Sequence, residues 1–121
     1  METSSRSGST SDPPGWLVKD GVVLASIEVA DGRAARARGL LGRDGIEGVL
    51  MLDGVRSIHT FGMRFPIDVA FCDRDGVVLR TVTVPRWRVT RPVPRAARAL
   101  EAEAGAFRRW GISAGDCVEL R

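Results

Sequence analysis

Long hydrophobic runs are missing from this sequence of 121 residues. Its apolar stretches, such as 49–52 and 69–72, are four residues long, whereas a membrane-spanning helix needs about 20. The first 14 residues carry Ser, Thr, Gly, Pro, Asp and Arg without an apolar core, which excludes a secretory signal of the usual kind. We therefore expect no membrane contact, a cytoplasmic location and a disordered tail over residues 1–14.

Cysteine is scarce, and its scarcity excludes a disulfide scaffold. Only Cys72 and Cys117 are present, each in an apolar stretch. Two thiols cannot build the bridge framework of a small secreted domain, so a reducing compartment is the simpler interpretation. One bridge between the two remains an alternative at this stage.

Lysine is nearly absent, which weakens an argument from net charge. Seventeen of the 18 basic residues are Arg, and fifteen acidic residues are interspersed among them. The net charge of +3 and the pI near 9.6 are therefore compatible with an ordinary solvated surface. The densest basic stretch begins at Arg86, includes Trp87 and ends at Arg98. It has no recognised nucleic-acid motif, so nucleic acid is an unlikely partner.

The first half of the chain reads as short strands and one helix. Asp20-Gly21 favours a tight turn, which predicts a hairpin over residues 16–29. Asp31 could cap a short helix over residues 33–38, ended by Gly39 or Gly42. Strands are then expected at residues 48–52 and 56–61.

The second half begins with the strand 66–73, in which Ile67, Val69 and Phe71 share one face. The other face is expected to be a polar stripe that begins at Asp68. A turn and a returning strand over 77–84 follow, and three prolines predict a loop over 85–94. Residues 97–104 are ambiguous, because their composition favours a helix.

The end of the chain is expected to form a helix over 106–110 and a strand over 116–120. This order of elements predicts an α+β fold in which residues 15–121 make one domain. We expect a strongly curved, mainly antiparallel sheet or a partly open barrel, with two short helices. A monomer is the expected state.

Three blocks of residues resemble the domain of unknown function family 192. They are Arg38-Gly39-Leu40-Leu41-Gly42-Arg43, then His59-Thr60-x-x-Met63-Arg64-x-Pro66-Ile67-Asp68, and finally Leu100-Glu101 with Gly115-Asp116. The resemblance covers roughly residues 27–120. It implies a compact α+β domain with a bent sheet and assigns residues 97–103 to a strand. The family has no established activity to transfer.

This chain departs from many relatives of that family at residues 59–62, where it has His-Thr-Phe-Gly in place of a Trp-Met-Lys-Asn type of stretch. It is similar to a histidine-bearing variant. Relatives often carry an export signal, which this sequence lacks.

His59 and Asp68 are the candidate catalytic residues. His59 is the only histidine, and histidine is the residue type that titrates nearest to neutral pH. Asp68 lies among apolar residues, so its carboxylate should be exposed, paired with an arginine or raised in pKa. Both residues also have structural interpretations: His59 could be hydrogen-bonded at a strand end, and Asp68 could form an ion pair.

The candidate ligand-binding residues surround this segment. Their side chains offer guanidinium, imidazole, thioether and carboxylate groups to a ligand: Arg38, Arg43, His59, Met63, Arg64, Asp68 and Glu101. Arg38, Arg43 and Arg64 are also the possible ion-pair partners of Asp68. Neither paired histidines nor a Cys-x-x-Cys motif is present, and no phosphate loop appears, so we expect no metal and no cofactor.

These residues leave the function open. The first hypothesis is a small non-enzymatic accessory domain that binds a small ligand or peptide in a polar pocket near His59 and Asp68. The alternatives are a small hydrolase- or isomerase-type enzyme using these two residues as an acid–base pair, and nucleic-acid binding through Arg86–Arg98. The enzyme hypothesis requires the two side chains to meet.

Overall fold

The computed structural model describes residues 13–121. The predicted tail over residues 1–14 therefore lies, except for its last two residues, outside the described part of the chain. The elements follow one another as β1 (Trp16–Lys19), β2 (Val22–Val29), α1 (Arg33–Arg38), β3 (Val49–Asp53), β4 (Ile67–Cys72), β5 (Val78–Val84), β6 (Arg98–Glu103), α2 (Ala106–Arg109) and β7 (Glu119–Leu120). The predicted α+β class with two short helices is confirmed.

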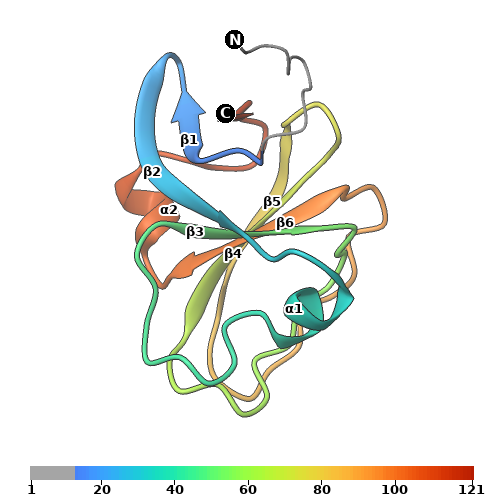
Figure 1. Ribbon diagram of the computed structural model, residues 1–121. Coiled ribbons are helices and arrows are strands. Elements are labelled where there is room, and N and C mark those ends of the chain that lie inside the picture. Colours follow the sequence, from blue (N-terminus) through green and yellow to red (C-terminus); the bar gives the residue numbers. More distant parts are fainter. Residues whose placement is uncertain (1–12) are drawn as a thin grey trace, which may run out of the picture.

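The seven strands form one curled sheet in the order β5-β4-β6-β3-β2-β1-β7. All neighbours are antiparallel except β2 and β3, which pair in parallel. β2 is long and curves across the molecule, so the sheet closes into a half-barrel (Figure 1). The first and last strands pair with each other, and the Gly15 N–H donates to the Arg121 carbonyl at 2.7 Å.

Both faces of β4 are buried, which corrects one prediction. Ile67, Val69 and Phe71 do share a core face, as expected. The opposite face was expected to be polar, but Ala70 and Cys72 are fully buried there. β4 lies between β5 and β6 and is covered on both sides, so even its second face belongs to a core.

The sheet separates two clusters of buried side chains. One contains Met51, Ala70 and Leu100, which are direct neighbours across β3, β4 and β6, and it packs against Phe107 of α2. The other contains the adjacent row with Leu50 and Val69, and lies on the side of α1. This alternation places neighbouring residues of one strand in different cores.

The segment 56–61 is not a strand, contrary to the sequence prediction. It makes only an isolated bridge between His59 and Val89. Its main anchor is Thr60, which is fully buried and holds the loop 85–88. The Thr60 hydroxyl donates to the Pro85 carbonyl at 2.6 Å and accepts the Arg88 N–H at 3.0 Å. An extended segment thus pairs with a proline-rich loop, which cannot provide a regular ladder.

The other predicted boundaries are largely confirmed. Residues 98–103 form β6, as the family resemblance implied against local propensity. α1 ends at Gly39, but its N-cap residue is Gly32, and no side chain caps it, so the expected Asp31 cap is wrong. The final strand is shorter than expected and begins at Glu119. An isolated bridge at Cys117 precedes it.

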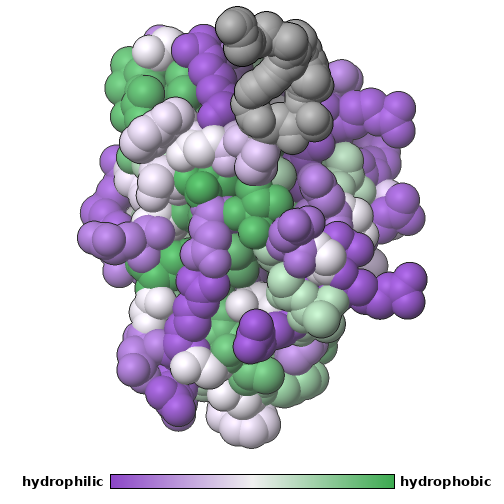
Figure 2. Space-filling model, viewed as in Figure 1, coloured by the Kyte–Doolittle hydropathy of each residue, from purple (hydrophilic) through white to green (hydrophobic). Residues whose placement is uncertain are grey.

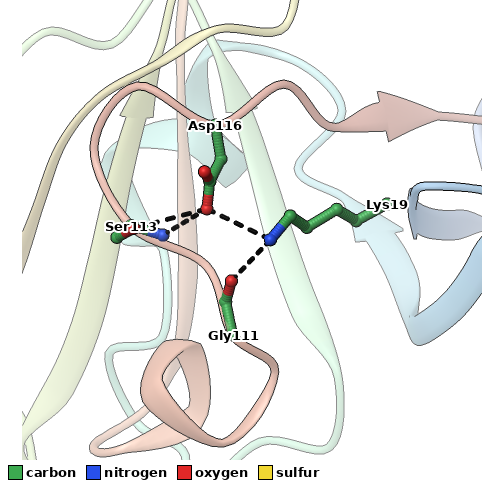
Figure 3. Close-up of polar contacts among 4 residues, drawn as sticks. All are labelled: Lys19, Gly111, Ser113 and Asp116. Carbon is green, nitrogen blue, oxygen red and sulfur yellow. Dashed lines mark hydrogen bonds and ion pairs between the residues drawn. The ribbon is translucent and has the colours of Figure 1, made fainter.

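The C-terminal turn is held by a polar cluster (Figure 3). Asp116 accepts the Ser113 N–H at 2.8 Å, and its carboxylate lies 3.3 Å from Lys19 Nζ on β1. Lys19 also donates to the Gly111 carbonyl at 2.7 Å. The Ser113 N–H and the Lys19 ammonium lower the pKa of Asp116. Asp116 therefore supports the turn and joins it to β1.

The described part of the chain exposes a few large hydrophobic residues and carries two free thiols. Figure 2 shows hydrophobic residues at the surface as separate small areas, one of them over the turn of the β1–β2 hairpin, where Val22 and Val23 are exposed. Neither helix among residues 13–121 has the length and apolar character needed to cross a membrane. Cys72 and Cys117 are both free thiols, the first buried and the second exposed.

Candidate functional site

A pocket of about 370 Å³ lies between α1 and the segment 55–63. α1 and the residues after it line one side, with Arg33, Arg36, Ala37, Arg38, Gly39, Leu40 and Leu41. The other side is formed by Val55, Ser57, Ile58, His59, Phe61 and Met63, and β6 contributes Glu101. Four of the seven predicted ligand-binding residues therefore border one pocket, namely Arg38, His59, Met63 and Glu101.

Glu101 is the unusual residue of this pocket. It lies on β6 between Leu50 of β3 and Val69 of β4, in a row of the sheet that is otherwise apolar. Its side chain is 3% exposed, and Oε1 has no hydrogen-bond partner. Because an unpartnered buried polar group costs about 1–3 kcal/mol, such groups are rare without a role.

Burial also changes the acidity of Glu101. Removal from water disfavours the charged carboxylate and raises its pKa from 4.5 to about 7, and the positive charge of Arg43 opposes this effect only in part. The carboxyl group is therefore able to exchange its proton near neutral pH. Titratable groups with such shifts are concentrated at functional sites.

Three arginines of α1 stand at the pocket. Arg33, Arg36 and Arg38 make no ion pair with an acidic residue within residues 13–121. Among residues 13–121, Glu101 is the only acidic residue that lines the pocket. The positive charge along this side is consequently not neutralised by the described protein.

His59 and Phe61 form an aromatic wall. Their rings are stacked, with centroids 5.3 Å apart and an angle of 21° between planes. The Phe61 N–H donates to His59 Nδ1 at 3.3 Å, which orients the imidazole. Phe61 continues toward Trp87, with ring centroids 6.3 Å apart. The backbone of Thr60, fixed by the loop 85–88, sets the position of both wall residues.

Asp68 does not belong to this pocket. It shares the sheet face of Ala70, where its two oxygens accept the Thr83 hydroxyl at 2.6 Å and the Phe107 N–H at 3.3 Å. Register places Glu101 opposite Val69, so Asp68 and Glu101 point to opposite faces. The two candidate ligand-binding residues therefore do not face one pocket, and Asp68 has Thr83 and the start of α2 as partners instead of the expected arginine.

The acid–base pair of His59 and Asp68 is consequently not formed. His59 lines the pocket beside α1, whereas Asp68 lines a hollow of about 220 Å³ with Thr83 and Phe107 on the other side of the sheet. A general base and its orienting carboxylate must be within hydrogen-bond reach. The sheet between them removes this possibility.

Arg43 and Arg64 also lie outside the pocket. Arg43 donates two hydrogen bonds to Glu28 on β2, at 2.9 and 2.6 Å. Arg43 thus joins the segment after α1 to the sheet through an ion pair with Glu28, not with Asp68. Arg64 pairs with Asp44 at 2.8 Å on the surface. An anion held jointly by Arg38 and Arg43 is therefore not supported.

Sequence reasoning missed Arg33, Arg36 and Phe61. The signal for the first two was available, because residues 33, 36 and 37 have the i, i+3, i+4 spacing of one helix face. Phe61 could not be assigned, since its placement depends on the loop 85–88, which is distant in sequence.

The fold and the pocket define a small domain with a curled sheet and a ligand-sized pocket beside its first helix. The sequence matches the model of the DUF192 family, described as "Uncharacterized ACR", over residues 17–120. The chain belongs to this family, as the three sequence blocks implied. Among curated proteins, none matches the chain.

Two crystal structures are similar to this chain. One is described as a "putative transcription regulator" from Sinorhizobium meliloti 1021, with 24% identity, a TM-score of 0.74, and coverage of 88% of this chain and 92% of that one. The other is a protein of unknown function from Novosphingobium aromaticivorans DSM 12444, with 19% identity, a TM-score of 0.73, and coverage of 98% and 99%. At these identities the likeness establishes the fold.

Proposed function

We propose that this chain is a non-enzymatic domain that binds a small ligand, or a short peptide segment, in the pocket between α1 and the segment 55–63. The observation that carries the proposal is the Glu101 carboxyl group, which is buried at this pocket with Oε1 unpartnered. Four residues singled out by the sequence border the same pocket, and Asp68 is not among them.

A purely structural role explains Glu101 poorly. Its neighbours in the row, Leu50 and Val69, are apolar and fully buried. A leucine or methionine at position 101 would therefore pack against them without the free-energy cost of burying a carboxyl group. A ligand that hydrogen-bonds to Oε1 would remove the unfavourable free energy of the unpartnered atom. A stability cost of this kind is typical of residues that serve binding.

The enzyme hypothesis has less support. Its acid–base pair is divided by the sheet, and no group of three potential metal ligands occurs among residues 13–121. The remaining pocket groups, Glu101 and His59, can bind and orient a ligand without performing a reaction. We therefore favour binding over catalysis.

The test is to map ligand contacts by NMR on the isotopically labelled protein. A screen of small polar metabolites should give amide shift changes that cluster at Gly39, Phe61, Met63 and Glu101. Glu101→Leu should abolish these changes. Glu103→Gln is the matched control, because Glu103 lies two residues further along β6 but is exposed and paired with Arg109. Shifts that occur elsewhere, or that persist in Glu101→Leu, would contradict the proposal.

A second candidate function is nucleic-acid binding through the loop that follows β5. It is favoured by Trp87, which is 57% exposed and has a left-handed backbone with φ of 62°. A shallow hollow here is lined by Arg64, Arg86 and Arg88 together with Trp87, and no carboxylate lines it. Exposed aromatic and arginine side chains suit single-stranded nucleic acid.

The measurement for this candidate is fluorescence anisotropy with a labelled oligothymidylate over a salt series. Three phosphate contacts should give a slope of about −2 in log affinity against log salt. Trp87→Ala should weaken binding, whereas Trp16→Ala, which removes a similarly exposed tryptophan on β1, should not. Salt-independent retention, or equal effects of the two variants, would dispose of this candidate.

A further inference from the structure

We propose that the ligand of the pocket is a single hydroxylated ring that bears a carboxylate or phosphate group. This inference rests on the proposed binding function and adds the chemical class of the ligand. Three features carry it, one for each part of such a molecule: the carboxyl group of Glu101, the arginines of α1, and the aromatic wall of His59 and Phe61.

Glu101 fits a hydroxyl group. A carboxyl group offers acceptor oxygens and, when protonated, a donor, so it can bond to a ligand hydroxyl in either state. Oε1 lies under the backbone of Gly39, where a Cβ would stand only 3.3 Å away. The absence of a side chain at Gly39 therefore leaves room for a ligand atom to approach this oxygen.

The arginines of α1 can bind the negatively charged group of the proposed ligand. Arg33 and Arg36 line the pocket without an acidic partner in the described residues, whereas five other arginines are ion-paired: Arg43, Arg64, Arg98, Arg109 and Arg121. A guanidinium group binds carboxylate and phosphate oxygens in a planar, two-point arrangement. An anionic group at the α1 side would supply the missing counter-charge.

The aromatic wall of His59 and Phe61 and the volume of the pocket suit a ligand with one ring. Phe61 is 47% exposed, so a flat apolar face is accessible beside the stacked His59. A volume of about 370 Å³ is near the lower end of small-molecule pockets, which span about 300–1,000 Å³. It suits one ring with substituents better than a longer chain of rings.

The pH dependence of ligand affinity tests the proposed ligand class, because the charge of Glu101 changes with pH. Four arginines and the imidazole of His59 are the charged and titratable groups around its carboxyl: Arg33, Arg36, Arg38, Arg43 and His59. An anionic ligand favours the protonated carboxyl, so its affinity should fall as pH rises through about 7. An ammonium group favours the carboxylate, and its affinity should rise over the same range.

The experiment is isothermal titration calorimetry with glucuronate at pH 6 and pH 8, and with glucose, lactate and glucosamine at pH 6, where the glucosamine amine is protonated. Glucuronate carries both ring hydroxyls and a carboxylate whose charge is constant over this range. We expect it to bind at least ten-fold more tightly than glucose, which lacks the charge, and lactate, which lacks the ring. Its affinity should be higher at pH 6, and this difference should persist in His59→Gln.

Variants of the arginines measure how much these residues contribute to glucuronate affinity. The double variant Arg33→Ala, Arg36→Ala should weaken glucuronate binding at least ten-fold. The control Arg108→Ala, Arg109→Ala removes two arginines of α2, on the other side of the sheet, and should leave it unchanged. Tighter binding of glucosamine or glucose than of glucuronate, or equal effects of the two double variants, would overturn this inference. If those probes still shift the pocket amides, the broader binding function survives. If no compound of any class does, both fail.

Discussion

The carboxyl group of Glu101 lies directly beneath the backbone of Gly39, so that a Cβ on Gly39 would stand 3.3 Å from Oε1. Gly39 ends α1, and Glu101 lies in the middle of β6, more than 60 residues later. The helix end and the buried acid thus meet at one point, where both line the pocket. The family block around Gly39 and the block around Glu101 therefore line one pocket.

Substitution of Gly39 should block this site. Gly39→Ala forces a Cβ against Glu101 and also places a non-glycine residue at φ of 52° and ψ of −124°, a sparsely populated conformation that costs about 1–3 kcal/mol. Gly42→Ala is the matched control, since Gly42 also has positive φ, at 88°, but open space around its Cβ position. We expect both variants to lose stability in urea unfolding because of their positive φ, Gly39→Ala at least as much as Gly42→Ala, and only Gly39→Ala to lose pocket binding in the NMR titration. Loss of binding in both would assign the effect to backbone strain.

Asp68 should act as a structural residue that fixes α2 to the sheet. Asp68→Ala removes the acceptor of the Thr83 hydroxyl and of the Phe107 N–H and should lower the free energy of unfolding by about 3 kcal/mol. Thr83→Val removes only one of these bonds and should cost about 1 kcal/mol. Urea unfolding gives both values. Ligand shifts at the pocket should remain in both variants, and their disappearance would indicate coupling across the sheet.

Patterns local in sequence predicted most of the fold. The Asp20-Gly21 turn fixed the first hairpin, and alternation in β4 identified Ile67, Val69 and Phe71 as a core face. The opposite face of β4 was wrongly predicted to be polar. The sequence of one strand does not reveal that β4 is an inner strand with neighbours on both sides. Only the pairing of distant strands determines that property.

Sequence patterns identified several residues of the candidate site but not which of them lie together, because this also depends on the pairing of distant strands. His59, Arg38 and Glu101 were identified as polar residues in conspicuous blocks, but which of them meet depends on register. A shift of one residue along a strand moves a side chain to the other face. Asp68 and Glu101 differ by such a shift across the β4–β6 pair, and one sequence does not contain that information.

The two cysteines should differ completely in reactivity. Burial raises the pKa of Cys72 to about 12, and Arg98 opposes this only in part, while Cys117 is exposed. Because the thiolate is the reactive form, Ellman's reagent should detect one thiol per native chain and two in urea. Cys117→Ser should leave no reactive thiol in the native protein. Rapid modification of both native thiols would show that the core around Cys72 opens readily.

Glu101 should make the protein less stable as pH rises from about 4.5 to about 7. Its pKa is near 4.5 when exposed in the unfolded chain and about 7 when folded, so the folded state binds more protons over this interval. Unfolding then releases a proton, and the free energy of unfolding decreases with pH, by at most about 3 kcal/mol. Below this interval the carboxyl is protonated in both states, and above it the carboxyl is ionised in both. The contribution therefore levels off on either side.

Glu101→Gln removes this proton exchange and should flatten that part of the stability profile, which urea unfolding at pH 4.5, 6 and 7.5 would measure. The difference in unfolding free energy between Glu101→Gln and the original protein should grow with pH. Glu103→Gln should keep the original slope, because Glu103 is exposed on the same strand. Parallel profiles for the original protein and Glu101→Gln would mean that water solvates the Glu101 carboxylate in the free pocket, so that its pKa is not raised. The unpartnered oxygen would then lose its significance as a binding signal.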